Sequence, residues 1–185
     1  DYDHLIRLFN VKYVNPIHLP EISDIWIRDF GPLFLKDHDS IKPVRFRYDP
    51  SYSKTKNEKV WAASNDSAGY QLTKQMPVKI ELEGNELILD GGNFIHNGLG
   101  TAIVTNRIIS DNEHLFEHEI REILKEKLGI EKLHIIPSEP GDDTGHIDGL
   151  VRFLDPETLL VGQYPEHFPE GRKFTDKIAT FLSHQ

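Results

Sequence analysis

The feature that most constrains the fold is an amphipathic segment at residues 111–128. Its apolar residues recur at the spacing of one helix face. Asp111 or Asn112 can cap its start, and Gly129 can end it. We therefore predict a helix over residues 111–128. The apolar face consists of Leu115, Phe116, Ile120, Ile123, Leu124 and Leu128.

Short strand candidates lie on both sides of this helix, and two further helices are expected at residues 57–75 and 172–183. Residues 97–100 form a good hairpin turn between the strands expected at 93–95 and 101–105. The order is strands then a helix, three times over, which predicts a mixed α/β fold and weakly indicates a repeated ββαβ unit. The other strand candidates are residues 11–17, 32–35, 44–48, 78–82, 87–89, 133–136, 150–154 and 158–162.

The composition excludes several functions. The chain carries 30 acidic and 21 basic side chains, a net charge of −9, which argues against a nucleic acid as partner and is compatible with a small cationic ligand. No apolar run approaches the ~20 residues that span a bilayer. The chain has no cysteine, so disulfides, thiolate metal sites and a cysteine nucleophile are excluded within these 185 residues.

A first polar motif lies at residues 24–32 and ends in a Gly-Pro turn. A carboxylate where a strand meets a turn can pair with a cation, and the ring of Trp26 can pack against a flat one. Alternatively, this is a surface turn in which Arg28 pairs with Asp24 or Asp29, and the residue types favour neither interpretation.

A second motif joins an apolar run to Asp90, Gly91 and Gly92. Glycines allow the backbone to approach another group closely or to adopt a positive φ. An acid at the first position of a tight turn is nevertheless common, and the residues alone favour a tight turn.

A third motif spans residues 141–150. If residues 146–148 are extended, the side chains of His146 and Asp148 point to the same side. An imidazole and a carboxylate on one face suit proton transfer and cation binding. A polar turn that enters a strand at 150–154 is the alternative, and a metal site that adds another histidine is a weaker one.

Together and in this order, the three motifs resemble the agmatine deiminase and Porphyromonas-type peptidylarginine deiminase family. The resemblance covers residues 11–165, and its fold would be a five-bladed ββαβ propeller, the pentein fold, of which this chain would form part. The matching segments are residues 26–32 (WIRDFGP), 90–93 (DGGN) with 98–101 (GLGT), and 145–149 (GHIDG).

The resemblance implies a role for each matching position. Asp29 and Asp148 would hold a substrate guanidinium through charge-assisted hydrogen bonds, and Trp26 would form a wall of the pocket. His146 would be the general acid and base that protonates ammonia and then activates water. Asp90, where many members carry glutamate, would support the histidine.

The family mechanism also needs a cysteine, whose thiolate attacks the guanidinium carbon before water releases a ureido product. In the family this cysteine follows the His-x-Asp motif, and this chain has none. We therefore expect residues 1–185 to be a single partial deiminase domain from the middle of such an enzyme. The N-terminal part and the C-terminal, cysteine-bearing part would be absent, and the chain alone would be catalytically silent.

The resemblance implies a small cationic guanidino substrate, no metal or organic cofactor, and a cytoplasmic enzyme of putrescine biosynthesis. It leaves agmatine, free arginine and peptidyl arginine open; Arg45 and Arg47 could face the far end of the substrate or simply face water. A partial propeller exposes sheet edges, so we expect a larger parent chain or a homo-oligomer. A domain that binds arginine-like cations without turnover is the alternative function.

Overall fold

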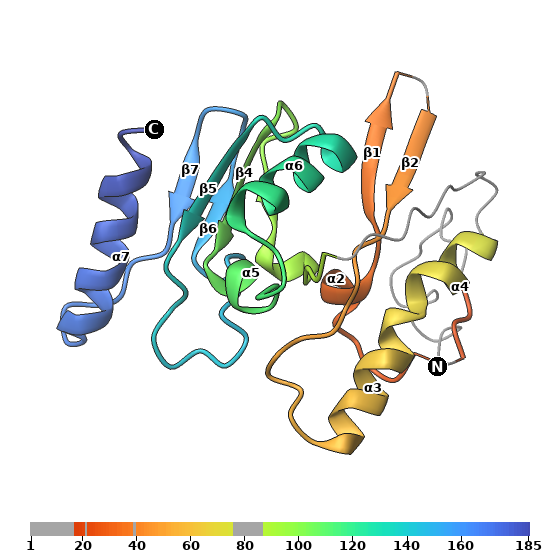
Figure 1. Ribbon diagram of the computed structural model, residues 1–185. Coiled ribbons are helices and arrows are strands. Elements are labelled where there is room, and N and C mark those ends of the chain that lie inside the picture. Colours follow the sequence, from red (N-terminus) through yellow and green to blue (C-terminus); the bar gives the residue numbers. More distant parts are fainter. Residues whose placement is uncertain (1–16, 21, 39, 76–86) are drawn as a thin grey trace, which may run out of the picture.

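The computed structural model describes residues 17–20, 22–38, 40–75 and 87–185 (Figure 1). The strands expected at 11–17 and 78–82 lie outside these residues, apart from Ile17. The helices are α2 (Ile27–Phe30), α3 (Lys56–Asp66), α4 (Ala68–Gln75), α5 (Arg107–Ser110), α6 (Glu117–Leu128) and α7 (Pro169–Leu182), with a 3₁₀ turn η1 (Gly91–Asn93). The strands are β1 (Leu33–Asp37), β2 (Ser40–Val44), β3 (Ile95–His96), β4 (Thr101–Thr105), β5 (Lys132–Ile136), β6 (Val151–Phe153) and β7 (Leu159–Val161).

The largest sheet among the described residues has three strands, in the order β3-β4-β5. β3 and β4 form an antiparallel hairpin, and β5 runs parallel to β4 after the crossover helix α6. This is one ββαβ unit, and the prediction of a mixed α/β fold is confirmed. Side chains alternate across β4, so Ala102 and Val104 pack with Ile120 of α6, whereas Ile103 packs with Ile178 of α7 on the other face.

The predicted hairpin turn and the end of the main helix are confirmed. Asn97 Oδ1 accepts hydrogen bonds from the backbone N–H groups of Leu99 and Thr101, at 2.8 and 3.1 Å. Gly129 ends α6 with a φ of 68°, a left-handed conformation that glycine adopts without strain.

The expected start of this helix is wrong. Residues 111–116 lie outside any helix, between α5, which ends at Ser110, and α6, which begins at Glu117. The N-cap of α6 is Phe116, whose backbone N–H donates to the Glu119 carboxylate at 2.7 Å. Asn112 is fully buried instead, and its side-chain amide bonds the backbone N–H and C=O of Ile88, both at 2.8 Å. This long-range pairing takes Asn112 out of the helix.

The prediction of a half-exposed strand at residues 44–48 is also wrong. β2 ends at Val44, after which the chain leaves the β1-β2 hairpin and Arg47 forms a single parallel bridge to Ile88. Arg45 forms an ion pair with Asp66 at the end of α3, and Asp66 also accepts the backbone N–H of Tyr48 at 2.7 Å. These bonds turn residues 45–48 toward the helices.

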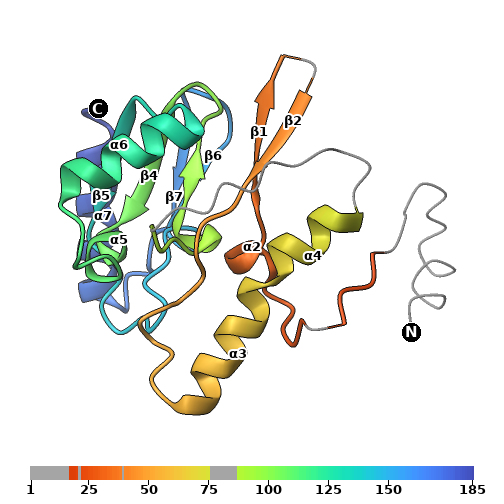
Figure 2. The same cartoon turned by 45° about the vertical axis from the view of Figure 1, so that its right-hand side comes forward.

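The single helix expected at 57–75 consists of α3 and α4, which meet at Ser67. Both helices lie on the side of α2 that is opposite the β3-β4-β5 sheet (Figures 1 and 2). The C-terminal elements follow the prediction more closely. β6 and β7 form an antiparallel hairpin within 150–162, and α7 begins at Pro169, a favoured first helical residue.

Thr55 begins α3 with a capping box, in which its hydroxyl accepts the Glu58 backbone N–H at 3.2 Å and the Glu58 carboxylate accepts the Thr55 N–H at 2.7 Å. Thr55→Ala removes one of these bonds. We expect it to lower the free energy of unfolding by about 1 kcal/mol, measured by urea denaturation. Thr180→Ala in the last turns of α7 is the control, with an expected change below about 0.5 kcal/mol. Equal losses in both variants would contradict the capping role.

None of the helices within the described residues is both long and apolar enough to cross a lipid bilayer.

Candidate functional site

Residues of the first and third polar motifs line one pocket with a volume of about 610 Å³. The pocket lies between the α2 segment, the loop that follows β2, and the loop that precedes β6. Its lining residues are Asp24, Trp26, Arg28, Asp29, Tyr48, Tyr52, Trp61, Thr144, His146, Asp148 and Arg152. Asp90 does not line the pocket directly but contacts His146 from the buried side.

Gly92 brings the first and third motifs together. Its backbone N–H donates to Asp29 Oδ1 at 3.1 Å, and its carbonyl oxygen accepts the backbone N–H of Asp148 at 3.1 Å. A Cβ atom at this position would overlap Asp29 Oδ1 and would lie 2.5 Å from His146 Nδ1. Gly91 likewise has no room for a Cβ against the Arg28 carbonyl oxygen of α2.

These contacts correct the interpretation that the residues alone favoured for the second motif. The tight turn exists, because η1 begins directly after Asp90. However, neither Gly91 nor Gly92 has a positive φ, so the conformation itself does not require glycine. Both glycines are needed because the backbone of η1 lies against the first motif, and Gly92 also lies against the third.

Asp90 and His146 form a buried pair beneath the pocket. Asp90 Oδ2 lies 3.1 Å from His146 Nε2, and the two side chains are 3% and 8% exposed. When a carboxylate is ionised it can only accept, and in that form of the pair Nε2 is the donor of this hydrogen bond. The other ring nitrogen, Nδ1, faces Asp29, with 3.7 Å between Nδ1 and Oδ1.

Burial and the neighbouring charges shift the pKa values of Asp29 and His146. Burial raises the pKa of Asp29 to about 6; the charges of Asp90 and Asp148 act in the same direction, and His146 opposes them. Burial alone would lower the pKa of His146, but the hydrogen bond and charge of Asp90, with the charges of Asp29 and Asp148, raise it above its ordinary value.

The third motif is not extended as expected. Residues 147–150 form a turn in which the N–H groups of Leu150 and Val151 donate to the Ile147 carbonyl, and β6 starts only at Val151. His146 and Asp148 nevertheless line the same pocket, because the Asp148 backbone is bonded to Gly92. The expectation that His146 and Asp148 lie close together is therefore confirmed, but the expected reason, a shared strand face, is wrong.

Trp26 and Asp148 lie nearer the mouth of the pocket. The Trp26 side chain is 62% exposed, and Asp148 is 28% exposed with its Oδ2 3.5 Å from Arg152 Nη2. Arg28 donates to the Phe94 carbonyl oxygen at 3.2 Å and so ties α2 to the segment after η1. Buried and exposed acceptors thus line one cavity, an arrangement suited to a flat cation with several N–H donors.

Arg45 and Arg47 do not line this pocket. Arg45 pairs with Asp66 and lies over the Tyr70 ring, and Arg47 pairs with Asp49. Within the described residues, no group of three or more histidine or carboxylate side chains has the arrangement of a metal site.

Sequence reasoning did not identify Tyr48, Tyr52, Trp61, Thr144 or Arg152 as pocket residues. The two tyrosines come from the loop between β2 and α3, and Trp61 from α3 itself. The two tyrosines belong to no recognisable sequence motif. They reach the site because Tyr52 contacts Asp90 and Tyr48 contacts Tyr52.

Comparisons with known proteins give consistent results. Residues 4–184 match the sequence model of the Porphyromonas-type peptidyl-arginine deiminase family. A protein of Latilactobacillus sakei is 32% identical over 156 residues, which are 75% of this chain and 40% of that protein. An agmatine deiminase of Pseudomonas syringae is 25% identical over 86% of this chain and 45% of its own length.

Among solved structures, an agmatine deiminase of C. jejuni matches with a TM-score of 0.72 and 26% identity, over 87% of this chain and 48% of that one. The chain therefore spans less than half the length of each of these three proteins.

Proposed function

The chain belongs to the Porphyromonas-type peptidyl-arginine deiminase family, and from this premise we propose that it forms the guanidino-binding part of a C–N hydrolase. The reaction would replace one nitrogen of a guanidinium by the oxygen of water, releasing ammonia and a ureido product. Agmatine is the favoured substrate, because the relatives from Pseudomonas syringae and C. jejuni are agmatine deiminases. Free arginine and peptidyl arginine are the alternatives.

One observation carries the proposal: Asp29, His146 and Asp148 line one pocket, with Asp90 hydrogen-bonded to His146 beneath it. A guanidinium ion presents five N–H donors in a plane and pairs well with carboxylates. Asp29 and Asp148 would accept these N–H groups. Trp26, at the mouth, would pack against the cation or its alkyl chain.

His146 would transfer protons through Nδ1, since Nε2 is engaged by Asp90. A protonated His146 can supply the proton that departing ammonia needs, and the neutral form can then take a proton from water. Asp90 would stabilise the protonated form. The carboxylates that raise the pKa of His146 favour the proton-donating form at the start of the reaction.

The nucleophile is the part of this mechanism that residues 1–185 do not contain, because they include no cysteine. Covalent catalysis by a thiolate would therefore need a cysteine from outside these residues. The same absence favours the second candidate function, in which the domain binds arginine-like cations without turnover. For the fold, we propose that the ββαβ unit formed by β3, β4, α6 and β5 is one blade of a five-bladed propeller.

Isothermal titration calorimetry with agmatine tests the binding proposal. The wild-type chain is expected to bind, and Asp148→Asn is expected to weaken binding at least about tenfold, because a charge-assisted hydrogen bond contributes roughly 1.5–3 kcal/mol. Asp176→Asn on α7, outside the pocket, makes the same chemical change and should leave the affinity unaltered.

Two results would contradict the binding proposal: no binding by the wild-type chain at millimolar agmatine, or equal affinities for Asp148→Asn and wild type. An ammonia-release assay separates binding from hydrolysis. The chain is expected to bind agmatine and to release no ammonia. Release of ammonia would mean that a group other than a thiol performs the nucleophilic step.

A further inference from the structure

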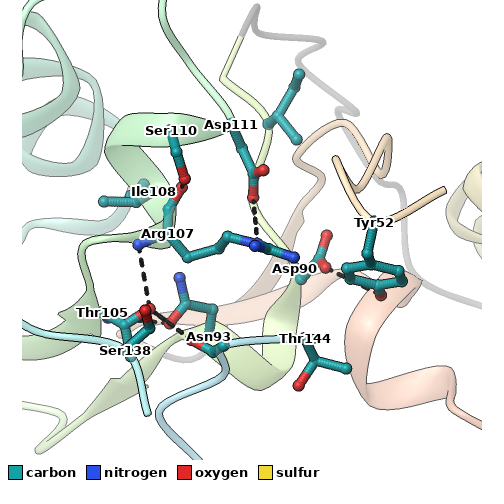
Figure 3. A network of polar contacts seen from close by, with 12 residues as sticks. Tyr52, Asp90, Asn93, Thr105, Arg107, Ile108, Ser110, Asp111, Ser138 and Thr144 are labelled. Carbon is teal, nitrogen blue, oxygen red and sulfur yellow. Dashed lines mark hydrogen bonds and ion pairs between the residues drawn. The ribbon is translucent and has the colours of Figure 1, made fainter. Parts of the chain in front are cut away.

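A chain of hydrogen bonds reaches His146 from the loop after β2. The Tyr52 hydroxyl donates to Asp90 Oδ2 at 3.3 Å, and the Tyr48 hydroxyl lies 3.2 Å from that of Tyr52. Figure 3 shows the Tyr52 contact with Asp90. The Tyr52 ring also stands edge-on to the imidazole of His146, with 6.4 Å between ring centroids. Tyr52 therefore contacts both members of the Asp90–His146 pair.

Asp90 depends on these contacts for its orientation. Its Oδ2 atom faces both Tyr52 and His146, whereas its Oδ1 atom is buried and has no hydrogen-bond donor among the residues that the structure describes. A buried carboxylate held through one oxygen can turn when one of its two donors is removed. Burial and the charge of Asp90 raise the pKa of Tyr52 above its usual range, so the hydroxyl remains a donor.

Arg107 holds the tyrosine ring in place. Its guanidinium lies over the ring at 5.5 Å from the centroid, and its Nε atom lies 3.6 Å from Asp111 Oδ2 (Figure 3). Its Nη2 atom donates to the Asp143 carbonyl oxygen. A cation above an aromatic face is attracted by the ring quadrupole. Arg107 thus fixes Tyr52 to α5 and to the loop that carries the third motif.

We propose that Tyr52 is a positioning residue that holds Asp90 Oδ2 against His146 Nε2, so that His146 presents Nδ1 to the pocket. The catalytic meaning of this assignment rests on the proposed function. The assignment itself concerns the free protein and can be tested without substrate. Failure of agmatine binding would therefore not affect it, and its failure would leave the binding proposal intact.

Nitrogen-15 NMR of the imidazole rings tests the proposal in Tyr52→Phe, which keeps the ring and removes only the hydroxyl. The signals of His146 are those that disappear in His146→Gln. In wild type we expect the neutral ring to carry its proton on Nε2. In Tyr52→Phe we expect part of the population to carry it on Nδ1, and the pKa of His146 to fall by about half a pH unit or more. It falls because Asp90 no longer lies fixed beside Nε2.

Two tyrosine variants serve as comparisons. Tyr70→Phe removes a hydroxyl outside the pocket and should leave the His146 signals unchanged. Tyr48→Phe removes the neighbour of the Tyr52 hydroxyl and should give a smaller fall. Backbone amide spectra confirm that each variant is folded.

The proposal is overturned if the tautomer and the pKa of His146 in Tyr52→Phe equal those of wild type. It is also overturned if the pKa rises, since Tyr52 would then compete with His146 for Asp90 instead of holding it. An equal or larger effect in Tyr70→Phe or Tyr48→Phe would likewise contradict the assignment to Tyr52.

Discussion

Gly92→Ala is expected to abolish measurable agmatine binding and to destabilise the fold. A methyl group at this position would overlap Asp29 Oδ1 and lie 2.5 Å from His146 Nδ1, so both side chains must move. Overpacking in a filled region costs about 1–3 kcal/mol. The displaced groups are the ones that we assign to the cation, and loss of one or two charged hydrogen bonds weakens binding by about 100-fold or more.

The position of Gly92 explains why we expect Gly92→Ala to weaken agmatine binding more than Asp148→Asn does. Its N–H bonds the Asp29 carboxylate and its carbonyl bonds the Asp148 backbone, so one peptide segment sets the distance between the two proposed cation-binding residues. Asp148→Asn alters one acceptor and leaves this spacing intact. Gly92→Ala alters the positions of three polar groups together.

Gly149→Ala is the matched control, because a Cβ at Gly149 meets no atom within 4 Å and its φ is not in the left-handed region. Calorimetry with agmatine and urea denaturation measure both variants. We expect Gly149→Ala to keep wild-type affinity and stability to within about 0.5 kcal/mol. Wild-type affinity in Gly92→Ala would show that the site adjusts to the methyl group, and the proposed spacing role would then be wrong.

The sequence predicted those parts of the fold that depend on local patterns. The hairpin at residues 97–100 and the end of α6 at Gly129 follow from turn and cap chemistry within a few residues. The paths of Asn112 and of residues 45–48 could not be predicted, because bonds to Ile88 and Asp66, 24 and 18–21 residues away, determine them.

The same distinction applies to the site. The acidic and histidine residues could be identified from short motifs and from the family resemblance. Tyr52 belongs to no motif, and its relation to Asp90 crosses 38 residues of sequence. The sequence shows the two glycines after Asp90 but not why glycine is needed there, because the need comes from contacts with Arg28, Asp29 and His146 across the fold. A tight turn was the better prediction from local chemistry alone.

Agmatine affinity is expected to increase with pH between 5 and 8, and this is the second large effect. The raised pKa of Asp29, about 6, means that acidification protonates a carboxylate proposed to accept N–H groups of the cation. A guanidinium does not titrate in this range. Below pH 6 each pH unit therefore weakens binding by up to about tenfold.

His146 changes the affinity in the same direction. Its pKa is raised above the ordinary value, so it gains a positive charge at a higher pH than an ordinary histidine does. A protonated imidazole beside Asp29 repels a cationic ligand and competes with it for the carboxylate. The loss of agmatine affinity at low pH thus has two sources, the protonation of Asp29 and that of His146. Substituting each residue separately distinguishes them.

Calorimetry at pH 5, 6, 7 and 8 measures the dependence in wild type, Asp29→Asn and His146→Gln. Asp29→Asn should bind weakly and lose the steep dependence below pH 6, since an amide does not titrate. His146→Gln should keep that steep part and lose the part of the pH dependence that comes from the charge of the imidazole. A wild-type affinity that is constant from pH 5 to 8, or highest at pH 5, would contradict cation binding through Asp29. A steep dependence that persists in Asp29→Asn would instead assign the titration to another group of the pocket.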